Sequence, residues 1–279
     1  MKHPPVFRSA RLYSCALAAV IVTHGAQASN VVYQLTGTSG NWSSNSWDPT
    51  MGAIGAGDAA MYSETVDACA ITLDIPVTLG ALFTGATSTK GWTIDATSGI
   101  AMTLDGTGIN GSNNWFDHAG VAAIGSRGTL ANLSIMPEVV LSRTDLDMGN
   151  TKSGSLTLTG DLSASSGQVI TFRGGGSGVI ALNGNIGAHG SRIALCNQRG
   201  SGGGDVMIAG NLGSRVTCVT QNSSGSNLIL SGTNTHTGGT FVCAGVLQYQ
   251  SAESIGGAGR SVFVGTNGMA CADYPIDQA

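Results

Sequence analysis

The chain repeats a five-residue pattern in which apolar and polar positions alternate and a glycine follows. The clearest copies are Leu156–Gly160, Ile180–Gly184, Val206–Gly210 and Leu228–Gly232, with glycines 24, 26 and 22 residues apart. Another copy, Met102–Gly106, lies 54 residues before Gly160, about two periods earlier. Alternation at every second residue predicts a strand with one buried face. The closing glycine predicts a sharp turn that uses a positive φ.

A strand and turn that recur every 22 to 26 residues cannot bury their apolar face alone, whereas copies stacked at a strand spacing of about 4.8 Å can. We therefore predict an all-β fold, a right-handed parallel β-helix (solenoid) with an amino-terminal capping region. One dry vertical column is predicted to contain Leu158, Leu182, Ile208 and Leu230. The equivalent strand ends are predicted at Gly160, Gly184, Gly210 and Gly232. The alternative is a β-sandwich, whose strands recur at roughly 8–12 residues without a long common period.

Composition narrows the functional classes. Charged residues make up 10% of the chain, against about 25% in typical soluble domains, which argues against a helical bundle. Lys and Arg together number 12, too few for a nucleic-acid surface. Hydrophobic residues reach 42%, enough to bury a core. No phosphate loop or Cys/His cluster at zinc spacing occurs, so we predict neither cofactor nor metal.

The amino terminus has the layout of an export signal. Lys2, Arg8 and Arg11 precede an apolar run, Leu12–Val22, and the sequence Ala26–Ala28 forms a small-residue cleavage site. The run is too short to span a bilayer, so we predict no integral membrane segment. Loss of the three basic residues would take the net charge from −4 to −7. We expect an exported protein that is secreted or held at the cell surface or outer membrane.

We divide the chain into four segments. They are a signal peptide (1–28), a cap with the first coils (29–100), degenerate coils (101–227) and a final repeat with an incomplete coil (228–279).

Cysteines follow a similar rhythm. Five remain after the signal, and the last four, spaced 22, 25 and 28 residues apart, each come two residues after an apolar residue; they are Cys196, Cys218, Cys243 and Cys271. We expect these four to stack on a second strand of each coil. Two interpretations stay open: a ladder of free, buried thiols, or one or two coil-to-coil disulfides in an oxidising compartment.

The carboxy-terminal repeat resembles a known family. Residues 228–257 contain an apolar strand (Leu228–Leu230), Ser231-Gly232, the run Asn234–Thr240 and then Gly245–Leu247. This order is similar to that of the autotransporter-associated β-strand repeat. His236 stands where the family pattern has an aromatic residue, and we expect little effect on the fold because the position falls in a turn.

Residues 41–105 resemble the amino-terminal module that precedes such repeats, through Trp42, Trp47–Pro49, Gly57–Tyr62 and Gly91–Ile94. The tryptophans are expected to close the first coil with their large apolar area. The resemblance implies a passenger-type stalk at a bacterial surface, usually followed by an outer-membrane barrel or a sorting signal. Neither pattern follows Gly268, so we expect a barrel or sorting tail to be missing from this sequence.

Two groups of residues are candidates for chemistry. Arg143, Asp145 and Asp147 alternate at strand spacing, which would put a carboxylate pair and an orienting arginine on one face, as glycoside cleavage requires. The alternative is a solvated face with local ion pairs.

The second group is Trp115, Phe116, Asp117 and His118 in an expected turn. These residues would stack on a sugar, or else tuck their aromatic rings against the flank of the solenoid.

These features favour a non-catalytic, exported β-solenoid that acts as a structural, adhesin-like stalk. The alternatives are a carbohydrate-active β-helix enzyme (a polysaccharide lyase or hydrolase) and a glycan-binding module. The expected partners are surface glycans or other cells, and no nucleic acid.

Overall fold

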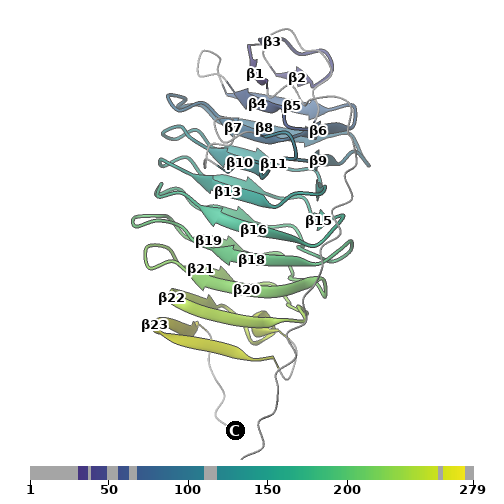
Figure 1. Ribbon diagram of the computed structural model, residues 1–279. Coiled ribbons are helices and arrows are strands. Elements are labelled where there is room, and N and C mark those ends of the chain that lie inside the picture. Colours follow the sequence, from purple (N-terminus) through teal and green to yellow (C-terminus); the bar gives the residue numbers. More distant parts are fainter. Residues whose placement is uncertain are drawn as a thin grey trace, which may run out of the picture.

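The structure is a computed structural model that describes residues 31–36, 39–48, 56–62, 68–109, 118–256 and 260–273. The chain is all-β and winds into a β-solenoid of about nine turns of stacked parallel strands (Figure 1). The predicted fold class is thus confirmed. The expected export signal (1–28) and Trp115, Phe116 and Asp117 lie outside the described residues.

Each turn adds one strand to a first face of the solenoid and one to a second face. The first face contains β1 (Val32–Leu35), β4 (Ala59–Tyr62), β7 (Ala81–Thr84), β10 (Ala122–Ser126), β13 (Leu146–Asn150), β16 (Gln168–Arg173), β18 (Ile193–Asn197) and β20 (Val216–Asn222). The second contains β2 (Gly40–Asn41), β5 (Cys69–Leu73), β8 (Trp92–Ala96), β11 (Leu133–Ile135), β14 (Leu156–Leu158), β17 (Ile180–Leu182), β19 (Val206–Ile208) and β21 (Leu228–Leu230).

A third face closes the cross-section of the middle turns. It contains β6 (Val77–Leu79), β9 (Met102–Leu104), β12 (Val139–Leu141) and β15 (Leu162–Ala164), followed by single bridges at Ile186 and Leu212. Two longer strands, β22 (Gly239–Tyr249) and β23 (Val262–Ala272), continue the stack below β20 and β21, with a short 3₁₀ helix, Ala252–Ile255, between them. At the other end, β3 (Trp47–Asp48) pairs antiparallel with β1.

Aliphatic side chains stack inside the second face in continuous columns. Leu158 pairs with Leu182, Leu182 with Ile208, and Ile208 with Leu230, and none of the four is more than 1% exposed. The same column begins further up with Ile71, Ile94 and Ile135. Each such buried side chain contributes about 1.5–3 kcal/mol. The columns therefore give the solenoid a dry core along its length.

The repeat glycines allow successive turns to approach closely. A Cβ on Gly210 would lie 1.8 Å from the carbonyl oxygen of Gly184, and one on Gly184 would lie 2.1 Å from that of Gly160. None of Gly160, Gly184, Gly210 and Gly232 has a positive φ, so the turn conformation expected for them is wrong. The backbone of the previous turn occupies the space that a side chain would need.

Two tryptophans lie over the first turn. Trp42 and Trp47 are 1% and 6% exposed, with ring centroids 4.8 Å apart and planes tilted by 47°. The Trp42 amide donates to the carbonyl of Thr72 at 2.8 Å, which fixes the ring over β5. Their rings cover the upper end of the apolar columns with large apolar area.

The cysteines do not form the expected ladder. Cys196 pairs with Thr220, Cys218 with Ala194 and Gly239, and Cys271 with Gln248, while Cys243 falls in a register shift of β22. Turns of unequal length and bulges in β18, β20 and β22 break the link between sequence spacing and register. Each cysteine in the described ranges is a free thiol, and desolvation raises the pKa of the Cys196 thiol.

Two further expectations need correction. Met102–Leu104 stacks on Val139–Leu141 in the third face, so this copy of the pattern does not belong to the Leu158 column. All three faces alternate in the same way, and the pattern alone does not separate them. His236, expected in a tolerant turn, is fully buried, and its Nε2 lies 3.3 Å from the hydroxyl of Thr240.

One corner of the solenoid has a polar interior. We call the buried side chains Asn150, Asn197, Arg199, Gln221, Ser223 and Ser226 the polar corner. Asn150 Nδ2 donates to the carbonyls of Gly154 (3.0 Å) and Gly178 (2.7 Å), and its Oδ1 accepts from Arg199 at 2.5 Å. Burial lowers the pKa of Arg199 to about 10. These side chains tie each turn to backbone groups of neighbouring turns.

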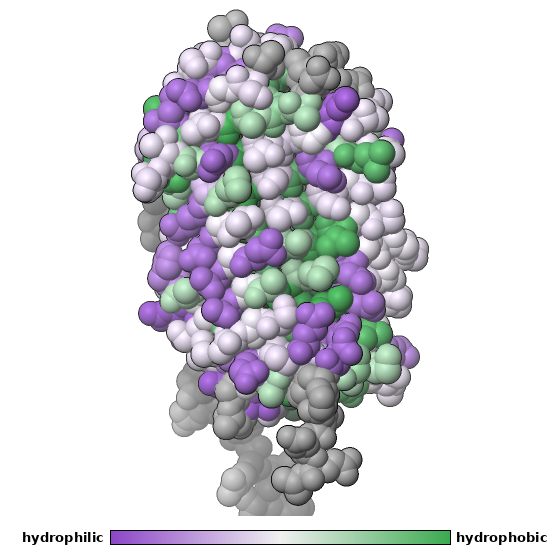
Figure 2. Space-filling model, turned by 180° about the vertical axis from the view of Figure 1, so that it is seen from behind, coloured by the Kyte–Doolittle hydropathy of each residue, from purple (hydrophilic) through white to green (hydrophobic). Residues whose placement is uncertain are grey.

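The outer surface carries few charges. Figure 2 shows one side of the rod as mostly pale residues, with small separate groups of hydrophilic and hydrophobic ones. On the outside of the first face, Ile109 packs on Ala59, Ala81, Phe83 and Ala123. Ile109 therefore covers outward-facing positions that would otherwise meet water.

Candidate functional site

A histidine, an aspartate and an arginine meet on the outside of the first face. Asp147 is the second residue of β13 and is 2% exposed. Its Oδ2 lies 2.6 Å from Nδ1 of His118, and its Oδ1 accepts a hydrogen bond from Nε of Arg173 at 2.6 Å. His118 arrives from the connection that precedes β10, and Arg173 ends β16 on the next turn. We call these three residues the outer triad.

The outer triad holds the imidazole in a fixed orientation. Both oxygens of Asp147 are engaged, and the side chain of His118 is 37% exposed. Within the described ranges, Nε2 of His118 has no hydrogen-bond partner. A carboxylate on one imidazole nitrogen and an open second nitrogen is the arrangement of a general base. Arg173 also donates to Oε1 of Gln198 at 3.3 Å, which links the arginine to the next turn.

The structure brings together one residue from each predicted group. Asp147 comes from the proposed carboxylate pair and His118 from the proposed sugar-binding turn, and they lie 29 residues apart in sequence. Asp145 has a separate partner, because its Oδ1 accepts the amide of Val169 at 2.8 Å. The two carboxylates therefore serve different contacts.

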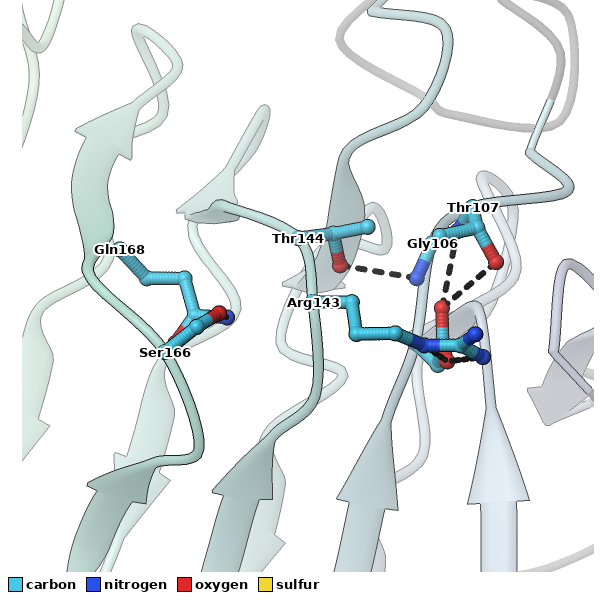
Figure 3. Close-up of polar contacts among 7 residues, drawn as sticks. Gly106, Thr107, Arg143, Thr144, Ser166 and Gln168 are labelled. Carbon is cyan, nitrogen blue, oxygen red and sulfur yellow. Dashed lines mark hydrogen bonds and ion pairs between the residues drawn. The ribbon is translucent and has the colours of Figure 1, made fainter. Parts of the chain in front are cut away.

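Arg143 does not orient either carboxylate, and that expectation is wrong. Its Nε donates to Oδ2 of Asp105 at 3.0 Å, and a second guanidinium nitrogen binds the same oxygen (Figure 3). The backbone of Arg143 has φ 66°, an uncommon left-handed conformation for a residue with a side chain. This conformation turns the side chain toward the previous turn and away from the face of β13.

Asp105 is itself the centre of a small polar group. Thr107 donates to its Oδ1 through the amide (3.1 Å) and the hydroxyl (2.7 Å), and Thr144 accepts the amide of Gly106 at 2.9 Å (Figure 3). Burial opposes ionisation, but the hydrogen bonds from Thr107 and then from Arg143 lower the pKa of Asp105. Since each of its oxygens is engaged, this group secures the start of the connection that reaches His118.

No three His, Cys, Asp or Glu side chains in the described part of the chain gather closely enough to hold a metal ion. No helix among the described residues is long and apolar enough to cross a membrane.

Sequence reasoning missed the link between His118 and Asp147, and also two exposed arginines, Arg192 and Arg215. Both arginines directly precede the first residue of a strand, a repeated placement that a search by turn would have found. The sequence carries no such signal for the contact between His118 and Asp147, because His118 lies between β9 and β10, outside the repeat.

Comparison with known proteins assigns the chain to no family. No protein-family profile, curated protein or solved structure matches the chain. The class of protein is therefore defined by the fold alone, a parallel β-solenoid.

Proposed function

We propose that this protein is a non-catalytic, exported β-solenoid that acts as a rigid, adhesin-like stalk at the cell surface or in secreted form. The observation that carries the proposal is the run of in-register apolar columns through about nine turns. At about 4.8 Å per turn, these columns support a rod roughly 40 Å long. The resemblance to the autotransporter-associated repeat and the export-signal pattern of residues 1–28 support the same proposal.

The composition of the surface also supports a spacer. Few charges face each other between turns, so successive turns stack with little electrostatic repulsion. Backbone hydrogen bonds join each strand to the equivalent strand of the next turn. A rod of this kind holds attached regions at a fixed distance without chemistry of its own.

The export proposal is tested with an epitope inserted at Ser201–Gly202, two exposed residues of one turn. We expect antibody labelling of intact cells or recovery from the medium, and an amino terminus at Ser29 in the exported protein. Labelling that requires cell lysis, together with retention of residues 1–28, would contradict the proposal.

A second candidate function is favoured by the outer triad. The oriented imidazole of His118 suits a general base in a carbohydrate-active enzyme, the alternative class for this fold. Asp147 would hold His118, and Arg173 would balance the charge of Asp147.

This candidate is tested by assays for cleavage of acidic and neutral polysaccharides. The Asp147→Asn and His118→Ala variants should lose cleavage, whereas Asp145→Asn, the matched carboxylate with a backbone partner, should keep it. Absence of cleavage by the unmodified protein removes the enzyme candidate and leaves the stalk.

A further inference from the structure

Two arginines occupy equivalent positions on successive turns of one corner. Arg192 immediately precedes Ile193, Arg215 immediately precedes Val216, and Ile193 pairs with Val216 across β18 and β20. The amide of Ile193 also donates to the carbonyl of Arg215 at 2.9 Å. Their backbones are therefore one strand spacing apart, about 4.8 Å.

Both guanidinium groups are exposed and lack an internal counter-ion. Neither side chain makes a hydrogen bond or ion pair with another residue of the described ranges. Arginines elsewhere on the solenoid behave differently: Arg143 binds Asp105, and Arg173 binds Asp147. Two like charges at this spacing repel each other unless an anion lies between them.

The arginines line a hollow that small residues leave open. The hollow has a volume of about 330 Å³ and is bordered by Gly167, Gly190, Ser191, Arg192 and Arg215. A side chain at Gly167 would meet nothing within 4 Å, so the space above its backbone is free. An oxyanion placed here would reach both guanidinium groups, which bind planar or tetrahedral oxyanions with paired N–H donors.

A second hollow of about 220 Å³ adjoins the first and shares Gly167 and Arg192 with it. Its other borders include Val169, Ala194 and Thr217, and Val169 is 37% exposed. One end of the combined groove is thus cationic and the other weakly apolar.

We propose that this groove binds an acidic polysaccharide, with the carboxylate or sulfate of one sugar between Arg192 and Arg215 and the C–H face of a ring on Val169 and Ala194. The inference names a ligand class for the stalk and rests on the proposed function for its extracellular setting. An acidic sugar combines the two features that the groove offers, an oxyanion and an apolar ring face. A nucleic acid fits less well, because the chain is acidic overall and has few basic residues.

The test is isothermal titration calorimetry at low and moderate salt with oligogalacturonate, dextran sulfate, neutral dextran and single-stranded RNA. We expect binding to either or both acidic glycans, weaker at higher salt, and none to neutral dextran. The double variant Arg192→Gln with Arg215→Gln should weaken binding at least about tenfold, because it removes two charged hydrogen-bond donors.

The control is a second double variant of equal charge, Lys90→Gln with Lys152→Gln. Both side chains are exposed and lie before strands of the second face, β8 and β14, whereas the groove lies before strands of the first face. It should bind within about twofold of the unmodified protein. Equal weakening in both double variants, binding to neutral dextran, RNA binding as tight as glycan binding, or no glycan binding would overturn the inference. A folded, surface-located protein that fails to bind glycans contradicts this inference alone, whereas a protein retained inside the cell contradicts the proposed function.

Discussion

The interior of the solenoid is filled in two different ways. The apolar columns of the second face contain interchangeable aliphatic side chains, such as Leu158, Leu182 and Ile208, that are at most 1% exposed. The polar corner instead contains side chains with specific partners, such as Asn150 on Gly178 and Asn197 on Gln221, one turn away. Both regions are buried, but only the second distinguishes one neighbouring turn from another.

This difference separates stability from register. A column of similar aliphatic residues gains nearly the same burial energy if one turn slips by two residues against the next, because the alternating side chains still face inward. A slip in the polar corner leaves buried donors and acceptors without partners, which costs about 1–3 kcal/mol for each group. We infer that the columns supply most of the stability and that the polar corner selects the correct stacking.

The largest expected effect comes from opening a cavity in the column. Leu182→Ala should lower the free energy of unfolding by about 4 kcal/mol, because the side chain is packed between Leu158 and Ile208. Urea unfolding followed by circular dichroism measures the change. Met207→Ala on β19, whose side chain is 38% exposed, is the control and should change the free energy by less than about 1 kcal/mol. Equal losses in the two variants would contradict a dry column.

The spacing between turns, on which both regions depend, is tested at a glycine. Gly210→Ala would place a Cβ 1.8 Å from the carbonyl oxygen of Gly184, so the two turns must separate. We expect a loss of about 3 kcal/mol in the free energy of unfolding. Gly167→Ala is the matched control, since its Cβ meets nothing within 4 Å and its φ is not positive. Thermal unfolding of both variants measures the effect. An unchanged midpoint for Gly210→Ala would contradict the close approach of the two turns.

The two interior regions also differ in how far the sequence predicts them. Leu158 and Leu182 were found because alternation and a common period mark a strand that stacks on its own copies. The glycines beside them are predicted at the right positions for the wrong reason. A sharp turn and a close approach between two turns both favour glycine, and the sequence does not separate the two causes. Cys196 and Cys218 were placed in one column because sequence spacing ignores the bulges that shift their register.

The polar corner and the candidate site escaped prediction for a physical reason. Asn150 and Arg199 lie 49 residues apart, and their contact depends on how two turns stack rather than on a local pattern. The same holds for His118 and Asp147, which lie 29 residues apart and meet on the outside of the first face. Contacts of this kind are set by register, and register appears only once the turns are assembled.

The polar corner is tested by removing one of its central groups. Asn150→Ala removes the side-chain donor to the carbonyls of Gly154 and Gly178 and one acceptor of Arg199, whose Nη2 still reaches Gly178 at 3.2 Å. We expect a loss of about 2 kcal/mol in the free energy of unfolding. Asn183→Ala, at an exposed position, should change it by less than about 0.5 kcal/mol. Urea titrations of the two variants compare them, and similar midpoints would remove the selective role of the corner.

The smallest expected effect concerns a buried polar residue outside the polar corner. His236 is fully buried, and desolvation, then the charge of Arg260, lowers the pKa of its imidazole. The unfolded chain therefore binds a proton near pH 6.5 that the folded chain binds only at lower pH. Stability should fall as the pH drops below about 6.5, by about 1 kcal/mol at pH 5.

His236→Phe, which restores the aromatic residue of the resembling repeat, should remove this pH dependence. The measurement is the free energy of unfolding at pH 5, 6 and 7, with His189→Phe as the control at a side chain that is 59% exposed. The control should keep the slope, because it leaves His236 and its surroundings unchanged. An unchanged slope in His236→Phe would show that the buried imidazole is not the titrating group. A lost slope would show that protonation of the buried imidazole of His236 destabilises the folded chain at low pH.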